Sequence, residues 1–351
     1  MSDQRISPPP FFIVGCVRSG TTLLQTLMDA HPEIAIPTES HLFTRFAGMF
    51  RHYGDLRQRA NLELLVRDLL TDERIKRWKL EASVEAFCLE VPAPTLRDVI
   101  THLYRLYARQ QGKPRWGDKT PQHTLCLGEI HGLFPEAQFI HLVRDGRDVA
   151  ESLSRVIIGK KSVLASARRW REAVSACDAF KATMPSGQFL ELRYESLVAR
   201  PETEIARVFE FLGVPPVRVV SDRRLPQTRL KETYIKTLGS HYQGLLNPIT
   251  EGRIRVYQAR FTPREVAIFE SVAGDTLERH GYARVTQGVA RVRWYEHLRF
   301  FWLDYGARYW RKIVNPAGYA DTARQVRETA QRKSRKLLRS LRPATNTGAQ
   351  T

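Results

Sequence analysis

Cysteine is scarce in this chain of 351 residues. The four cysteines, Cys16, Cys88, Cys126 and Cys177, have no paired spacing, which argues against a zinc site and against a disulfide framework. Unpaired thiols are typical of a reducing compartment. We therefore expect the protein to be cytoplasmic.

Long apolar runs are also missing. No uncharged apolar stretch approaches the ~20 residues of a membrane-spanning helix. The first ten residues do not combine a charged segment with an apolar core, so we expect no signal peptide. Hydrophobic residues make up 42% of the chain and charged residues 26%, which is typical of a globular protein.

Acidic residues are few toward the C-terminus. The net charge is +18, and residues 291–351 hold fourteen Lys and Arg but only four Asp and Glu. Such a basic tail on a mildly basic body indicates an anionic partner for the tail and polyanionic ligands for the body.

The most informative absence is a lysine. An apolar strand is followed by Gly15 and Gly20, five positions apart, and then by the hydroxyl residues Thr21 and Thr22. Backbone N–H groups and the positive end of the helix dipole in such a loop point at an anion. A nucleoside triphosphatase has Lys where this chain has Thr21, and here the nearest cation is Arg18, inside the loop. The sequence therefore predicts an anion cradle without the groups that bind a triphosphate and its metal ion.

Apolar runs alternate with helical patterns along the chain, which predicts an α/β fold with a P-loop-like parallel sheet and helices on both faces. Ligands of such sheets bind at the carboxyl ends of the strands. A helical insertion at about 55–110 and a helical C-terminal extension complete this prediction. We expect strands at 11–15, 139–143 and 188–193, helices at about 20–30, 123–133, 147–158, 162–183, 201–211 and 262–280, a loop at 116–121, and irregular structure at 214–262.

Two motifs resemble those of the sulfotransferase superfamily, whose members take a sulfuryl group from 3′-phosphoadenosine 5′-phosphosulfate (PAPS). The loop Arg18-Ser19-Gly20-Thr21-Thr22 resembles its 5′-phosphosulfate loop. The segment 143–152 resembles its 3′-phosphate motif, with Arg144 and Ser152 as ligands. The resemblance covers roughly residues 10–285 and implies PAPS as co-substrate, with no metal.

Three further features follow a bacterial branch that resembles tyrosylprotein sulfotransferases: the segment 27–32, Glu39, and the segment 194–197. The resemblance implies that Glu39 is the general base and that Tyr194 contacts the adenine. Many cytosolic sulfotransferases use a histidine as the base, so His41 is the alternative. For Tyr194 the alternative is a core tyrosine at a strand end.

The residue types suit this chemistry. A phosphosulfate group needs hydroxyls and a cation, which Thr21, Thr22 and Arg18 supply. A separate phosphate suits the guanidinium of Arg144 with the Ser152 hydroxyl, and Arg155 lies on the same helix face. The alternatives are plain helix capping for the hydroxyls and, for the arginines Arg144 and Arg147, a solvated helix start with local Asp pairs.

A base and a cation complete the predicted site. The apolar neighbours Ile36, Pro37, Leu42 and Phe43 predict a raised pKa for the Glu39 carboxyl. Lys119 resembles the family's transition-state lysine, whose ammonium neutralises developing charge. A solvated carboxylate and a surface lysine beside Asp118 are the alternatives, and we expect His123 to be structural or at the acceptor rim.

The late part of the chain departs from the tyrosylprotein branch. Asn247-Pro248 and Tyr257 stand at about the places of a lysine and a tryptophan. The nearby cations that could substitute are Lys231, Lys236 and Arg253.

The tail holds two helical patterns, an aromatic one at 291–312 and a basic one at 324–342. We favour packing on the domain itself or on a second subunit, as in a homodimer, over contact with an anionic membrane surface. Nucleic-acid binding is not favoured, because no recognisable module accompanies the charge.

Together these features predict a tail at 1–9, a sulfotransferase domain at 10–285, an extension at 286–343 and a disordered end at 344–351. The domain is expected to move a sulfuryl group directly, without a metal, to an acceptor hydroxyl of a tyrosine, sugar, lipid or phenol. The alternatives are a P-loop kinase or nucleotidase, and a non-catalytic nucleotide-binding protein that docks on membranes.

Overall fold

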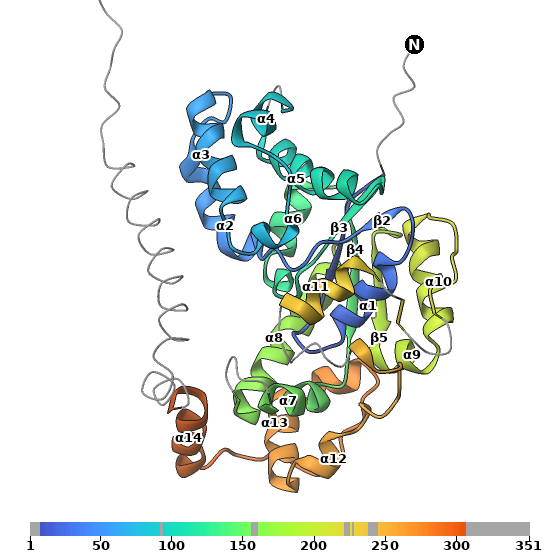
Figure 1. Ribbon diagram of the computed structural model, residues 1–351. Coiled ribbons are helices and arrows are strands. Elements are labelled where there is room, and N and C mark those ends of the chain that lie inside the picture. Colours follow the sequence, from blue (N-terminus) through green and yellow to red (C-terminus); the bar gives the residue numbers. More distant parts are fainter. Residues whose placement is uncertain are drawn as a thin grey trace, which may run out of the picture.

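The computed structural model describes residues 8–91, 94–155, 161–220, 225–226, 228–237 and 245–306 (Figure 1). Its strands are β1 (Phe11–Val14), β2 (Ile34–Ala35), β3 (Arg115–Lys119), β4 (Gln138–Val143) and β5 (Phe189–Arg193). They form one sheet in the order β2-β3-β1-β4-β5, and every pairing is parallel. All five carboxyl ends therefore meet at one edge, and the predicted α/β fold is confirmed.

The central strand β1 is apolar throughout because both of its faces are covered. Phe11 and Ile13 point into a core formed with α1 (Thr21–Asp29), α9 (Tyr194–Ala199), α10 (Pro201–Leu212) and α11 (Arg229–Thr237). Phe12 and Val14 point into a second core formed with the helices between β2 and β3. The alternation of side chains along one short strand thus joins two layers of helices to the sheet.

The prediction of a loop at 116–121 is wrong for its first part, because residues 115–119 form β3 beside β1. Gly117 and Asp118 are typical of turns. Here Gly117 is required by packing: a Cβ on it would lie 2.2 Å from the ring of Phe11. Only residues 120–121 of the predicted loop lie beyond the strand.

The helices surround the sheet, with α1 and α10 on one side and α5, α6 and α8 on the other (Figure 1). Local end signals placed several of them correctly. The Thr262 side chain caps α13 with a Pro at its first position, and Gly213 ends α10 in the left-handed region at φ 66°. The described α-helices are α1 (Thr21–Asp29), α2 (Leu42–Phe50), α3 (Arg59–Leu70), α4 (Val84–Leu89), α5 (Leu96–Gln110), α6 (Leu127–Leu133), α7 (Gly146–Arg155), α8 (Val163–Lys181), α9 (Tyr194–Ala199), α10 (Pro201–Leu212), α11 (Arg229–Thr237), α12 (Tyr257–Arg260), α13 (Pro263–Arg279) and α14 (Trp294–Phe301).

Between β2 and β3 the chain is helical, as predicted for 55–110. Helices α2 to α5 stand together beside the sheet, in blue and cyan in Figure 1. A capping box of Thr95 and Asp98 begins α5. Short helices complete the chain: η1 (Arg51–Tyr53), η2 (Ile75–Trp78), η3 (Pro121–Leu125) and the π-helical η5 (Trp302–Gly306).

Several predictions fall outside the described residues: the segment 1–7, the end of the helix expected at 147–158, the pattern at 324–342 and the disordered end. Within the described ranges no helix is long and apolar enough to span a bilayer. The four cysteines are free, and Cys16, Cys88 and Cys177 are buried.

Candidate active site

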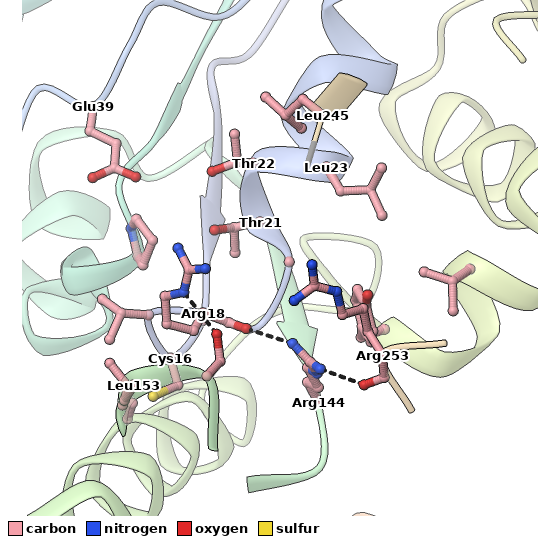
Figure 2. Close-up of a pocket in the computed structure, with 18 of the residues that line it drawn as sticks. Cys16, Arg18, Thr21, Thr22, Leu23, Glu39, Arg144, Leu153, Leu245 and Arg253 are labelled. Carbon is pink, nitrogen blue, oxygen red and sulfur yellow. Dashed lines mark hydrogen bonds between the residues drawn. The ribbon is translucent and has the colours of Figure 1, made fainter. Parts of the chain in front are cut away.

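A cavity of about 1330 Å³ lies at the carboxyl edge of the sheet. Figure 2 shows Arg18, Thr21 and Thr22 along one wall, with Glu39 beyond them and Arg144 near the other end. Gly20, Ser152 and Tyr194 also line the cavity. The Ser19 and Lys119 side chains are buried behind this lining, at 1% and 0% exposure. The structure therefore gathers the predicted site residues around one cavity, with these two just beneath its surface.

The loop between β1 and α1 forms this wall of the cavity. Gly20 begins α1 in the left-handed region, at φ 94°, and Arg18 is also left-handed at φ 73°. A Cβ on Gly20 would lie 2.5 Å from the ring of Tyr194, so only glycine fits here. No side chain caps the helix, which leaves the N–H groups of its first turn directed at the cavity. This geometry suits an anion.

Arg144 joins three parts of the site. Its guanidinium donates to the carbonyl oxygen of Arg18 at 3.1 Å and to that of Arg253 at 2.6 Å, and its Cζ lies 4.4 Å from the centre of the Tyr194 ring. Arg18 Nε donates to Ser152 Oγ at 3.1 Å. A solvated helix start, the alternative for Arg144, is therefore wrong.

Two buried polar atoms at this end have no hydrogen-bond partner within the described part of the chain. They are Arg144 Nε and Ser19 Oγ. Buried donors normally have partners, and leaving one unpaired is unfavourable. Both atoms belong to residues that the sequence assigns to anion binding, so a bound phosphate or sulfate group fits the place where partners are missing.

Arg147 has a structural role. It pairs with Asp145 at 2.7 Å and with Glu270 at 2.6 Å, and it is buried. The local Asp pair expected as the alternative is thus present, in a buried rather than a solvated place. Asp148 is also buried and accepts the backbone N–H groups of Arg255 and Tyr257 at 2.7 and 3.0 Å. This carboxylate fixes the loop that carries Arg253.

Three cations in the late part of the chain were expected near the site, and of these Arg253 lines the cavity. The Lys231 ammonium instead donates to the carbonyl oxygen of Leu225 at 3.3 Å, and the side chain of Lys236 lies outside what the structure describes. Asn247 and Pro248 line the cavity as well. Arg155 lines it too and pairs with Glu151 at 2.8 Å.

The carboxylate of Glu39 is held from two sides. Lys119 Nζ lies 2.5 Å from Oε1, and His41 Nε2 lies 3.2 Å from Oε2. The same ammonium donates to Thr22 Oγ1 at 3.2 Å and lies 5.3 Å from the centre of the Tyr234 ring. A surface position for Lys119 and a fully solvated Glu39 are both excluded, since the side chain of Glu39 is 23% exposed.

The expectation of a raised pKa for Glu39 is wrong. Burial does raise the pKa of this carboxyl, but the Lys119 ammonium and the hydrogen bonds from His41 and Lys119 more than offset it and lower the pKa to about 2. For His41, burial lowers the pKa despite its hydrogen bond to Glu39. A neutral His41 that donates Nε2–H to an ionised Glu39 is consistent with the lowered pKa of both groups.

No role is predicted for Asp118 from the sequence, yet this buried residue organises the segment that contains Glu39. Its Oδ2 accepts hydrogen bonds from Ser40 at 2.9 Å and Tyr104 at 2.6 Å, and its Oδ1 lies 2.9 Å from His123 Nδ1. Burial raises the pKa of Asp118, but His123 and these hydrogen bonds lower it overall. The buried His123 is therefore structural, one of the two roles expected for it.

The Asp118 network reaches the turn that follows Glu39, at Ser40 and His41. Ser40 Oγ accepts the N–H of Leu42 at 3.1 Å, and Thr120 Oγ1 accepts that of His41 at 3.4 Å. His41 is left-handed at φ 51°, a backbone conformation that needs such support. Asp118 thus holds the backbone on both sides of His41. The signal in the sequence is a carboxylate beside Lys119, in a segment that the sequence predicts as a loop and that forms strand β3.

A separate group of acids and histidine lies at the β5 edge. Asp178, Glu191 and His280 offer ligand atoms within 4.8 Å of one another. The cations Lys181 and Arg279 lie 3.9 and 3.7 Å from these carboxylates. They already compensate the negative charge, so the group is an ion-pair network.

A family model described as "Sulfotransferase family" matches residues 9–218. The protein-tyrosine sulfotransferase of Drosophila melanogaster is 29% identical over 213 residues, which is 59% of this chain and 38% of that protein. The nodulation protein NoeE of Sinorhizobium fredii is 27% identical over 237 residues, 61% of this chain and 53% of that protein.

Among solved structures, the sulfotransferase domain of the Synechococcus PCC 7002 olefin synthase aligns with 77% of this chain and 96% of its own, at 21% identity and a TM-score of 0.48. The chain spans about half the length of the curated relatives it matches.

Proposed function

The chain belongs to the sulfotransferase family, and on this premise we propose that it transfers a sulfuryl group from PAPS to an acceptor hydroxyl. The observation that carries the proposal is the meeting of Glu39, Lys119 and Thr22 at one end of the cavity that Arg144 lines at the other. A base, a cation and two anion-binding regions are the groups that this reaction needs.

The residues present fit PAPS. The loop Arg18–Thr22 would hold the 5′-phosphosulfate through its N–H groups and hydroxyls, and Arg144 with Ser152 would hold the 3′-phosphate. The unpartnered Ser19 Oγ and Arg144 Nε support both assignments. Tyr194, beneath the Arg144 guanidinium, would contact the adenine, and Arg253 would add a cation. When bound, PAPS supplies the activated sulfuryl group.

Glu39 is the proposed general base. Its carboxylate accepts the proton of the acceptor hydroxyl as that oxygen becomes a nucleophile. Each carboxylate oxygen already has one partner, so the acceptor hydroxyl has to use a remaining lone pair or displace one of these contacts. Opening the Lys119 contact raises the proton affinity of Glu39 and frees an ammonium for the charge that develops on the transferred group. His41 keeps the carboxylate oriented, and it remains the alternative base.

The acceptor belongs to the hydroxyl class. Tyrosine, sugar, lipid and phenol hydroxyls are the candidates, and the name of the Drosophila relative favours testing tyrosine peptides first. A kinase or nucleotidase is not favoured, since Thr21 occupies the place of the P-loop lysine.

Transfer from labelled PAPS to these four acceptor classes tests the proposal directly. Glu39→Gln should abolish transfer, while the matched change Glu63→Gln on α3 should leave it intact. In parallel, adenosine 3′,5′-bisphosphate should raise the melting temperature. Stabilisation by ATP with Mg²⁺ but not by the bisphosphate would contradict the proposal and favour a phosphoryl-transfer enzyme.

A further inference from the structure

Helix α14 and η5 present an unusual cluster of apolar side chains to solvent. Seven of the thirteen exposed large hydrophobic residues in the described part of the chain fall within 294–305. We call them the aromatic face. Its members are Trp294 at 75% exposure, Tyr295 at 46%, Leu298 at 55%, Phe301 at 57%, Trp302 at 69%, Leu303 at 39% and Tyr305 at 36%.

The opposite side of this segment is fixed to the domain by polar contacts. Arg264 on α13 binds Glu296 through two hydrogen bonds of 2.9 and 2.8 Å. Asp304 accepts the N–H of Ser162 at 2.8 Å and its hydroxyl at 2.7 Å, at the start of α8. Phe300 packs into the core formed with α7, α8 and α13. The expected packing on the domain is thus present on this side only.

Apart from Phe300, the segment is therefore inverted with respect to an ordinary surface helix, which buries its apolar side. Glu296 and Asp304 are buried, whereas both tryptophans project outward. Figure 1 shows α14 at the periphery of the molecule, away from the sheet. Contiguous exposed apolar patches mark interaction sites. Because the contacts of Glu296 and Asp304 hold the segment, it cannot turn the aromatic face inward without breaking them.

Charge identifies the partner. Arg291, Arg293 and Arg299 are exposed beside the aromatic face. The sequence that follows, 307–351, contains eleven Lys and Arg and two Asp and Glu. Tryptophan and tyrosine next to arginine are typical of segments that lie in the interface of an anionic bilayer, where the rings enter the headgroup region and the cations attract the lipids.

A second copy of the chain fits this surface less well. A two-fold interface centred on the aromatic face would place the arginines of one copy against those of the other. We propose that the aromatic face docks on the surface of an anionic lipid bilayer.

Vesicle co-sedimentation of the full chain tests this proposal. The probes are vesicles of phosphatidylcholine alone and vesicles in which about one third of the lipid is phosphatidylserine. The protein should sediment with the anionic vesicles only, and added salt should weaken binding because it screens the charges. The double change Trp294→Ser with Trp302→Ser should reduce the bound fraction about tenfold.

A matched control comes from α4, where Leu89 is 69% exposed, the same value as Trp302. Leu89→Ser should not change vesicle binding. Both proteins should keep the melting temperature of the unchanged chain, which separates loss of docking from loss of fold. Equal binding to both vesicle types, or none to either, contradicts the proposal. A dimer that the double change converts to monomer would assign the face to a second copy.

Discussion

Lys119 Nζ and Glu39 Oε1 lie 2.5 Å apart, although eighty residues separate them in the sequence. The contact joins the end of β3 to the segment that follows β2. The contact keeps Glu39 ionised, and at the same time it engages one of the two carboxylate oxygens. The proposed base and the proposed cation are therefore each other's partners in this structure.

Replacing Lys119 should change both the rate and its pH dependence. Lys119→Met removes the ammonium that stabilises developing charge, a loss of about two orders of magnitude in kcat or more. It also removes the cation that lowers the pKa of Glu39, so the acidic limb of the pH–rate profile should move to higher pH. Steady-state kinetics across pH measure both effects. Lys76→Met, an exposed lysine on η2, is the control, and an unmoved limb would contradict the assignment of Glu39.

Glu39 should contribute stability that is lost in acid. Its pKa is about 2 in the folded protein against an ordinary value of 4.5, so the unfolded state binds the proton more tightly. The contribution is complete above about pH 4.5, disappears as the pH falls toward 2, and amounts to at most about 3 kcal/mol. Denaturant unfolding at several pH values should show this acid-dependent part in the unchanged chain. Glu39→Gln should lack it, and identical pH slopes would refute the ion pair.

Asp118 should act on catalysis through position. Asp118→Asn weakens the contacts that hold the turn at Ser40 and His41 and leaves buried donors poorly paired, at a cost of roughly 3 kcal/mol of stability. Because Glu39 is then misplaced, kcat should fall at least about tenfold while the KM for PAPS stays the same. Tyr104→Phe removes one hydrogen bond to the same carboxylate and should have a smaller effect. A rise in KM with kcat unchanged would speak against this role.

Gly20 should tolerate no side chain. Gly20→Ala adds a Cβ 2.5 Å from the Tyr194 ring in a left-handed conformation. We expect a loss of about 1–3 kcal/mol and weaker binding of adenosine 3′,5′-bisphosphate. Gly128→Ala on α6 is the control, because nothing lies within 4 Å of the added atom and alanine favours the helix. Calorimetry of both variants measures this loss of stability. Equal melting temperatures would show that the Tyr194 ring moves aside at little cost, which would contradict the prediction.

Most of the fold could be predicted from local signals in the sequence. The apolar run of β1 and the end signals of α10 and α13 depend on neighbouring residues, so they were predicted correctly. Strand β3 was not predicted, because Gly117 is required by its contact with Phe11, which lies more than one hundred positions away in the sequence. The two-residue strand β2 is too short to leave a pattern. The domain boundary at 285 stays a prediction.

The site likewise has a part that could be predicted from the sequence and a part that could not. The proposed anion-binding residues were predicted from two motifs, since the loop at Arg18 and the helix after Arg144 are each continuous in sequence. The pKa of Glu39 was predicted in the wrong direction because its neighbours in sequence are apolar, whereas its partner in space is Lys119. The role of Asp118 was not predicted, because the buried network to which it belongs forms only when the chain folds.

The order of the strands has a consequence for biosynthesis. In β1, Phe11 lies opposite Gly117 on one side and Gln138 on the other, so both of its partners emerge from the ribosome more than one hundred residues later. Until then four consecutive apolar residues have no strand on either edge. Pairing over such sequence distances is slow and leaves strands open to aggregation. Expression of this protein should therefore benefit from slow translation and from chaperones that bind an extended N-terminal segment.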